Sequence, residues 1–192
     1  MDKDQRMITY FNRKGKHNTL DTLSIAKARA LELGIKHMTI ATSHAYTPRM
    51  AAEVLKGVDI NIVAVGLSAS FNEYGWDMSA EETQNVLDCG IKVCKAMHAF
   101  TGDVSEAFLG GNTVNKIVGD TLGIISQGTK VCVETAIMAA EAGLIPVDEE
   151  IIALAGTDGG ADTALVMKAN YARKFKQIQV LEILCKPRTP FV

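Results

Sequence analysis

Short apolar runs that alternate with helical patterns are the feature that most constrains the fold of this chain. Strand-like runs lie at 7–11, 38–41, 59–65, 91–97, 150–155, 163–168 and 178–185. Segments with apolar residues at helical spacing lie between most of them. This alternation implies a mostly parallel sheet with helices on both faces. We therefore predict an α/β fold, a three-layer αβα sandwich.

Length and composition set limits on the class of protein. The chain has 192 residues, which suits a single domain over 1–192. Its 20 basic and 22 acidic residues give a net charge of −2, which argues against nucleic acid as a main partner. No apolar run reaches transmembrane length, and the first residues lack the apolar core of a signal peptide. The four cysteines form no C-x-x-C pair, so we expect no metal site and a cytoplasmic location.

The stretch from Met38 to Leu55 predicts an anion site. A short strand passes through a hydroxyl-rich turn into a helix with Pro48 in its first turn, where a missing N–H costs nothing. The N–H groups and dipole of such a helix attract a phosphate, and Thr42, Ser43 and Thr47 add hydroxyl donors. The alternative is a plain turn in which Thr47 caps the helix.

Other polar segments should gather at the same edge of the sheet, because parallel strands all end there. These segments are Asn18-Thr19, the aromatic loop 66–78, His98 and the glycine-rich loop 156–162. The aromatic loop is either functional or a plug over the sheet edge. The 156–162 loop is either a binding loop or an ordinary hairpin turn. After Gly128-Thr129 we expect a helix from Lys130 to Ala142, with Glu134 and Glu141 on one solvated face. A site role for Glu134, near the helix start, is the alternative.

Several motifs resemble those of a known family. Residues 40–52 resemble the phosphate-binding strand, loop and helix of the pyruvate kinase C-terminal domain, and 150–168 resemble its final hairpin. Three segments, KVCVE at 130–134, IMAA at 137–140 and GGADTA at 159–164, are similar to small stand-alone archaeal proteins with that domain's fold. Two features differ from pyruvate kinase: His44-Ala45 stands where the effector loop has a glycine, and the chain has no room for a catalytic barrel of roughly 200 residues or more.

The resemblance implies a phosphate-bearing small molecule, with flavin mononucleotide (FMN) as the named ligand, and no pyruvate kinase activity. The phosphate would sit on the 42–47 turn, and the glycine-rich loop would approach the rest of the ligand. The candidate ligand-binding residues are Asn18, Thr19, Thr42, Ser43, His44, Thr47, Gly156, Thr157, Gly159, Gly160, Ala161, Asp162 and Thr163.

Three functions are compatible with these patterns. The chain is a sensor or carrier of a phosphorylated ligand, a flavin-dependent oxidoreductase, or a protein-association subunit with a vestigial pocket. His98 and His44 are the candidate general bases, because both follow strands at the presumed ligand edge. A hydrogen-bonded loop role is the alternative for each. We also expect a homo-oligomer, because isolated domains of this type tend to pair.

Overall fold

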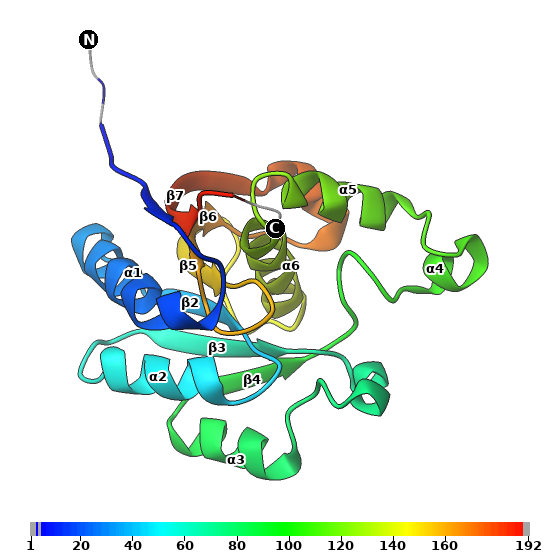
Figure 1. The fold of residues 1–192 in the computed structure, drawn as a ribbon, viewed down its shortest axis with the longest axis horizontal. Coiled ribbons are helices and arrows are strands. Elements are labelled where there is room, and N and C mark those ends of the chain that lie inside the picture. The colour runs from blue at the N-terminus through cyan, green and yellow to red at the C-terminus, as the bar shows by residue number, and fades with distance from the viewer. Residues whose placement is uncertain (1–2, 4, 190–192) are drawn as a thin grey trace.

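The computed structural model describes residues 3 and 5–189, and it has an α/β architecture (Figure 1). Seven strands form one sheet in the order β1-β7-β6-β5-β2-β3-β4. The strands are β1 (Thr9–Phe11), β2 (His37–Ala41), β3 (Asn61–Gly66), β4 (Lys92–Lys95), β5 (Glu150–Ala155), β6 (Thr163–Lys168) and β7 (Gln179–Pro187). Of these seven, β6 alone runs antiparallel to its neighbours. The expected mostly parallel sheet flanked by helices is confirmed.

Helices cover both faces of the sheet (Figure 1). One face carries α1 (Thr19–Leu33), α2 (Tyr46–Val54) and α3 (Ala80–Asp88). The other carries α6 (Gln127–Glu141), with α5 (Val114–Gly123) packed on it, while α4 (Val104–Leu109) projects from the body. Short 3-10 turns lie at η1 (Lys16–Asn18), η2 (Ala69–Tyr74) and η3 (Ala172–Gln177). Within the described ranges, no helix is both long and apolar enough to cross a membrane.

The core is divided into two layers by the sheet, and β5 shows how. Ile152 and Leu154 pack into the layer beneath α1, α2 and α3, whereas Ile151 and Ala153 pack toward α6. Consecutive side chains of a strand point to opposite faces, so a strand covered on both sides must be apolar throughout. This requirement explains the unbroken apolar runs of the sequence.

Local sequence signals explain where several helices begin and end. Ser79 and Glu82 form a capping box at the start of α3. Gly34 ends α1 in a left-handed conformation, which suits a residue without Cβ. Thr113 caps α5 with its hydroxyl, and the Gly110-Gly111 pair separates α4 from α5.

Three expectations about element boundaries are wrong. Thr47 does not cap α2: the helix already begins at Tyr46 with Ala45 as its cap, so Thr47 lies buried in the first turn. The helix expected from Lys130 begins earlier, at Gln127, because the Ser126 hydroxyl accepts the Thr129 N–H. The strand expected over 91–97 is shorter, since the pairing of this edge strand with β3 ends at Lys95.

Gly128, in the first turn of α6, marks a close approach of this helix to the sheet. A Cβ added there would overlap the Oγ1 and Cβ atoms of Thr163, the first residue of β6. The absence of a side chain therefore lets the start of α6 lie directly against the start of β6.

We predict that Gly128→Ala lowers the free energy of unfolding by about 1–3 kcal/mol, because overpacking displaces Thr163. This loss opposes the usual gain from placing alanine in a helix. Urea denaturation measures it. Gly159→Ala is the matched control, since a Cβ there meets nothing within 4 Å and needs no positive φ. Equal stability of the two variants would contradict the close packing.

Candidate functional site

The predicted site segments lie at one edge of the sheet. Since β1, β2, β3, β4, β5 and β7 run parallel, the loops that follow them all start at this carboxyl edge. The loop 156–162 joins them because it follows β5, a parallel strand. The structure therefore brings the basic loop 12–18, the turn 42–45, the aromatic loop 66–78 and the glycine-rich loop 156–162 to a common edge.

A buried carboxylate holds two of these loops together. The Asp162 side chain is fully buried, and its Oδ2 accepts the N–H groups of Gly15 at 2.7 Å and Thr157 at 3.2 Å. Its Oδ1 accepts the Thr163 hydroxyl at 2.9 Å. A charge removed from water is stable only when it is well bonded, so these donors are required. We call this arrangement the Asp162 clasp.

Hydroxyl groups extend the clasp in both directions. The Thr19 hydroxyl accepts the Ala161 N–H at 3.0 Å and donates to the Lys16 carbonyl at 2.7 Å. On the other side, the Thr163 hydroxyl lies 3.4 Å from the Ser126 hydroxyl, the cap of α6. One continuous buried network thus joins the starts of α1 and α6 to the glycine-rich loop.

Lys16 carries a positive charge to the start of α2. The residues Arg13, Lys14, Lys16 and His17 of the 12–18 loop are all exposed. The Lys16 ammonium lies 3.9 Å from the ring centroid of Tyr46, the first residue of α2, and a cation over an aromatic face is attracted to it. Ala45, the residue before the helix, has no side chain that can cap the first turn. The start of α2 therefore combines a helix N-terminus with a nearby ammonium group.

The rest of the 42–45 turn is committed to contacts within the chain. The Thr42 hydroxyl donates to the His44 carbonyl. The His44 ring lies 3.3 Å from the Glu82 carboxylate. Glu82 also accepts the N–H of Ser79, which holds the pKa of its carboxyl below the usual value, with a weaker contribution from His44. A negative charge from α3 therefore lies beside the turn, and Ser43 is the hydroxyl of the turn with no such commitment among the described contacts.

His98 is also bonded within the chain. Its Nε2 accepts the Ser68 N–H at 3.2 Å, and its Nδ1 lies 3.8 Å from Oε1 of Glu134. The Phe71 ring stacks on the imidazole with centroids 5.0 Å apart, and Phe71 in turn stacks on Trp76. His98 thus anchors the aromatic loop to the sheet edge, which favours the hydrogen-bonded role over that of a free general base.

The candidate ligand residues divide by exposure into two sets. Asn18, Thr19, Thr42, Thr47, Thr157, Ala161, Asp162 and Thr163 are buried. His44 is exposed, and Ser43, Gly156, Gly159 and Gly160 are partly exposed. The first set lies under the surface of the carboxyl edge. Asp162 and Thr163 are both fully buried, so they position the loops and do not face a ligand at the surface. Of the second set, Gly156 and Gly160 are packed against the chain itself, since a Cβ there would overlap Gly160 or Thr19, whereas a Cβ at Gly159 would meet nothing within 4 Å.

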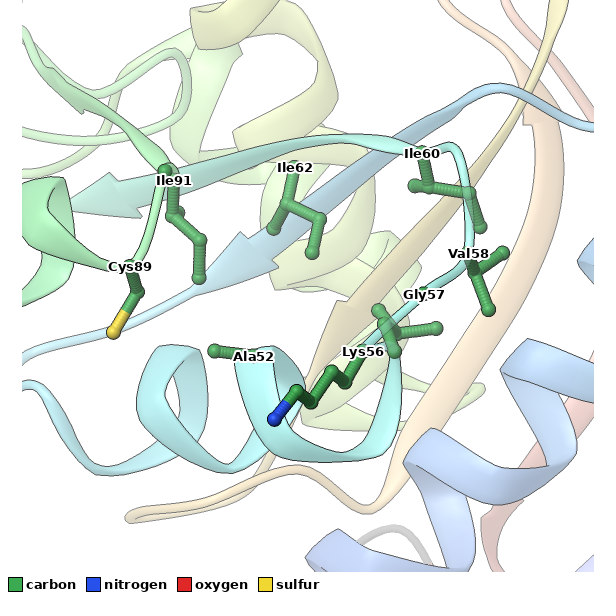
Figure 2. A pocket seen from close by; sticks show the side chains of 10 residues that line it. Ala52, Lys56, Gly57, Val58, Ile60, Ile62, Cys89 and Ile91 are labelled. Atoms are coloured by element: carbon green, nitrogen blue, oxygen red, sulfur yellow. The ribbon is translucent and has the colours of Figure 1, made fainter.

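Two surface hollows lie away from these residues. The first has a volume of about 290 Å³ and lies between the ends of α2 and α3 and the starts of β3 and β4, at the opposite edge of the sheet (Figure 2). Ile62 and Ile91 point into it, and Lys56 and Cys89 lie at its rim (Figure 2). Since two helices end there, the negative ends of their dipoles face this hollow, which disfavours a phosphate. The second, of about 200 Å³, lies between α5, α6 and η3.

Sequence patterns missed two residues of this edge. Glu134 was expected on a solvated face, but it is buried and accepts the Phe100 N–H at 3.0 Å. The sequence shows Lys16 only as one of several basic residues in the 12–18 loop. Its position over Tyr46 depends on the tertiary structure. In the part of the chain that the structure describes, no group of three or more His, Cys, Asp or Glu side chains could hold a metal ion.

The fold and this edge define an α/β protein with a polar, partly basic carboxyl edge. No protein-family model matches the chain. The assignment of a function therefore depends on the geometry of the site.

We predict that Asp162→Asn destabilises the protein by roughly 1–3 kcal/mol, because an amide leaves a buried N–H donor without an acceptor. Urea denaturation and hydrogen exchange of the Gly15 and Thr157 amides would measure the loss. Asp158→Asn is the matched control, since that side chain is exposed and only pairs with Lys14 at 3.3 Å. If both variants lost equal stability, the clasp would not be a major constraint.

We also predict that acid releases the aromatic loop. Burial lowers the pKa of His98 below its usual value near 6.5, opposed by the Glu134 carboxylate and assisted by Lys130. The neutral ring is therefore the form that the fold favours, and its contribution to stability is complete above about pH 6.5 and is lost as the pH falls through the lower, folded-state pKa. Imidazolium cannot accept the Ser68 N–H.

Fluorescence of Trp76, the only tryptophan, would report this release. We expect an acid transition in the wild type that is absent from His98→Gln and retained in His17→Gln, a control in the exposed basic loop. An unchanged transition in His98→Gln would assign the signal to another group.

Proposed function

We propose that this protein binds a phosphate-bearing small molecule at the carboxyl edge of its sheet and acts as a sensor or carrier of that molecule. The observation that carries the proposal is the Lys16 ammonium held over Tyr46 at the uncapped start of α2. An anion placed there meets a positive helix end, the backbone N–H groups of Tyr46 and Thr47, and a lysine together. Ser43 is close enough in sequence to add a hydroxyl donor.

The electrostatics of the turn decide where the phosphate sits. The Glu82 carboxylate, which contacts His44 and the Ala45 N–H, would repel the phosphate, whereas Lys16 over Tyr46 would attract it. The phosphate therefore binds toward Tyr46. The two opposed charges limit affinity, which suits a ligand that is bound and released.

FMN is the ligand we propose, and the aromatic loop supports this choice. The loop follows β3, the strand next to β2, and Tyr74 and Trp76 are 61% and 55% exposed. Exposed rings at this position offer stacking surfaces for a flat ring system. Bound flavin would supply redox chemistry, but His98 has its Nε2 committed to Ser68, so binding without catalysis is the simpler function.

The finer family assignment is part of the same proposal. We place the chain with the small stand-alone archaeal proteins that share the fold of the pyruvate kinase C-terminal domain, without the kinase activity. The motifs at 40–52 and 159–164 support this placement. A cytoplasmic location suits its four free cysteines, of which Cys89 is exposed.

The proposal is tested by comparing FMN with riboflavin, which lacks the phosphate, through quenching of Trp76 fluorescence. We expect FMN to bind at least about tenfold more tightly, since a charge-assisted contact contributes roughly 1.5–3 kcal/mol. Lys16→Ala should remove most of this difference. Glu82→Gln should increase it, because a repelling charge is lost.

The matched control is Lys36→Ala. Lys36 is an exposed lysine that precedes β2 at the opposite edge and pairs with Asp59. It should leave FMN affinity unchanged. Equal affinity for FMN and riboflavin, or equal effects of the two lysine variants, would exclude a phosphate site at α2.

A further inference from the structure

The helical arm formed by α4 and α5, residues 104–125, exposes an unusual amount of apolar surface. The described side chains of α4 include no buried residue, and α5 buries only Gly119 and Gly123. Phe108 is 84% exposed and Val114 is 75% exposed. Val104, Leu109, Ile117 and Ile124 are also exposed. Apolar side chains exposed in this number on one short segment are typical of a surface for association.

The charges of the arm are compensated within it or beside it. Lys116 pairs with Asp120 at 2.9 Å, one helical turn away. The Glu106 carboxylate accepts the Gly102 N–H, and Asp103 accepts the Glu106 N–H at 3.0 Å as the cap of α4. Such a surface does not select a strongly charged partner. It also does not repel an identical copy of itself.

A hollow of matching chemistry lies at the base of the arm. Its volume is about 200 Å³, and its walls include Phe100, Val118, Ile137 and Phe175. The Phe100 and Phe175 rings meet edge to face with centroids 6.1 Å apart. An apolar cavity of roughly 150 Å³ is sufficient to hold benzene, so this hollow has room for a phenyl ring. Phe108 of the same chain does not line it.

We propose that the arm is the interface of a homodimer, in which Phe108 of each copy inserts into the hollow of the other. The projecting ring and the hollow lie on one chain and both are uncharged, and among the described residues the ring is 84% exposed and does not line the hollow. A two-fold axis makes both contacts at once and closes the assembly. The arm with the walls of the hollow is similar in size to the roughly 20–30 residues that each partner contributes to a standard interface. This inference does not depend on the ligand proposed above.

The test is sedimentation velocity of the full chain over a range of concentrations. We expect the wild type to be a dimer at micromolar concentration, and Phe108→Ser to weaken association at least about 30-fold, as loss of a central aromatic anchor does. Because Phe108 is exposed, this change should leave the monomer folded. Leu31→Ser, at a 60% exposed position of α1 far from the arm in the fold, is the matched control and should remain dimeric.

A second variant tests the hollow independently. Ala172→Trp, at an exposed position in its wall, fills the space from within the same chain and should also give monomers while Phe108 is intact. Each of three results would overturn the proposal: a monomeric wild type, an oligomer that both variants leave intact, or an open-ended polymer in place of a closed dimer. A monomer that associates only with a different protein would overturn it as well.

Discussion

The buried carboxylate of Asp162 is the constraint on which the carboxyl edge depends. An ionised group with no exposed surface must find donors inside the protein, and the nearest donors belong to segments far apart in the sequence. One is the N–H of Gly15, 147 residues away, and another is the N–H of Thr157. Satisfying this one charge fixes the basic loop against the glycine-rich loop. Gly15 and Gly160 both adopt positive φ, which the close approach of the two loops requires. The contact between the two loops is therefore enough to explain Gly15 and Gly160, without a bound ligand.

In this arrangement the buried residues of the glycine-rich loop hold the loops together, whereas the exposed Lys16 is the group available to a ligand. The glycine-rich loop has the composition of a ligand-binding loop, yet its buried members bind the scaffold through Asp162, Ala161 and Thr157. Because the clasp holds Gly15, the next residue along, Lys16, is directed to the start of α2. The charge that we propose binds a phosphate is thus held in place by the clasp although it belongs to a loop. Preorganisation of this kind reduces the entropy lost on binding.

The sequence was sufficient for the α/β class with its mostly parallel sheet, but only partly for the site. Strands were predictable because a sheet covered on both faces requires continuous apolar runs, and the Ser79 and Glu82 capping box is a local signal. Glu134 could not be placed from helical spacing alone, because its burial depends on the Phe100 N–H and on His98 from another segment. The start of α6 was obscured by Gly128, a poor helix former whose presence is explained only by its contact with Thr163. Long-range contacts of this kind cannot be recognised from the periodicity of apolar residues in the sequence.

The composition of α6 connects the two surfaces of the molecule. Its inner face carries small residues such as Ala136, Ala139 and Ala140, which allow the helix to lie close to the sheet. A helix with small side chains fills less space around itself, so the outer layer must supply the bulk. Here α5 supplies it only in part, through Val118 and Leu122, and the hollow beside Phe100 stays open. The hollow lies where α5 leaves the side of α6 near Ile137 uncovered. An aromatic ring from a second copy would bury apolar surface there, which is the driving force of the association proposed above.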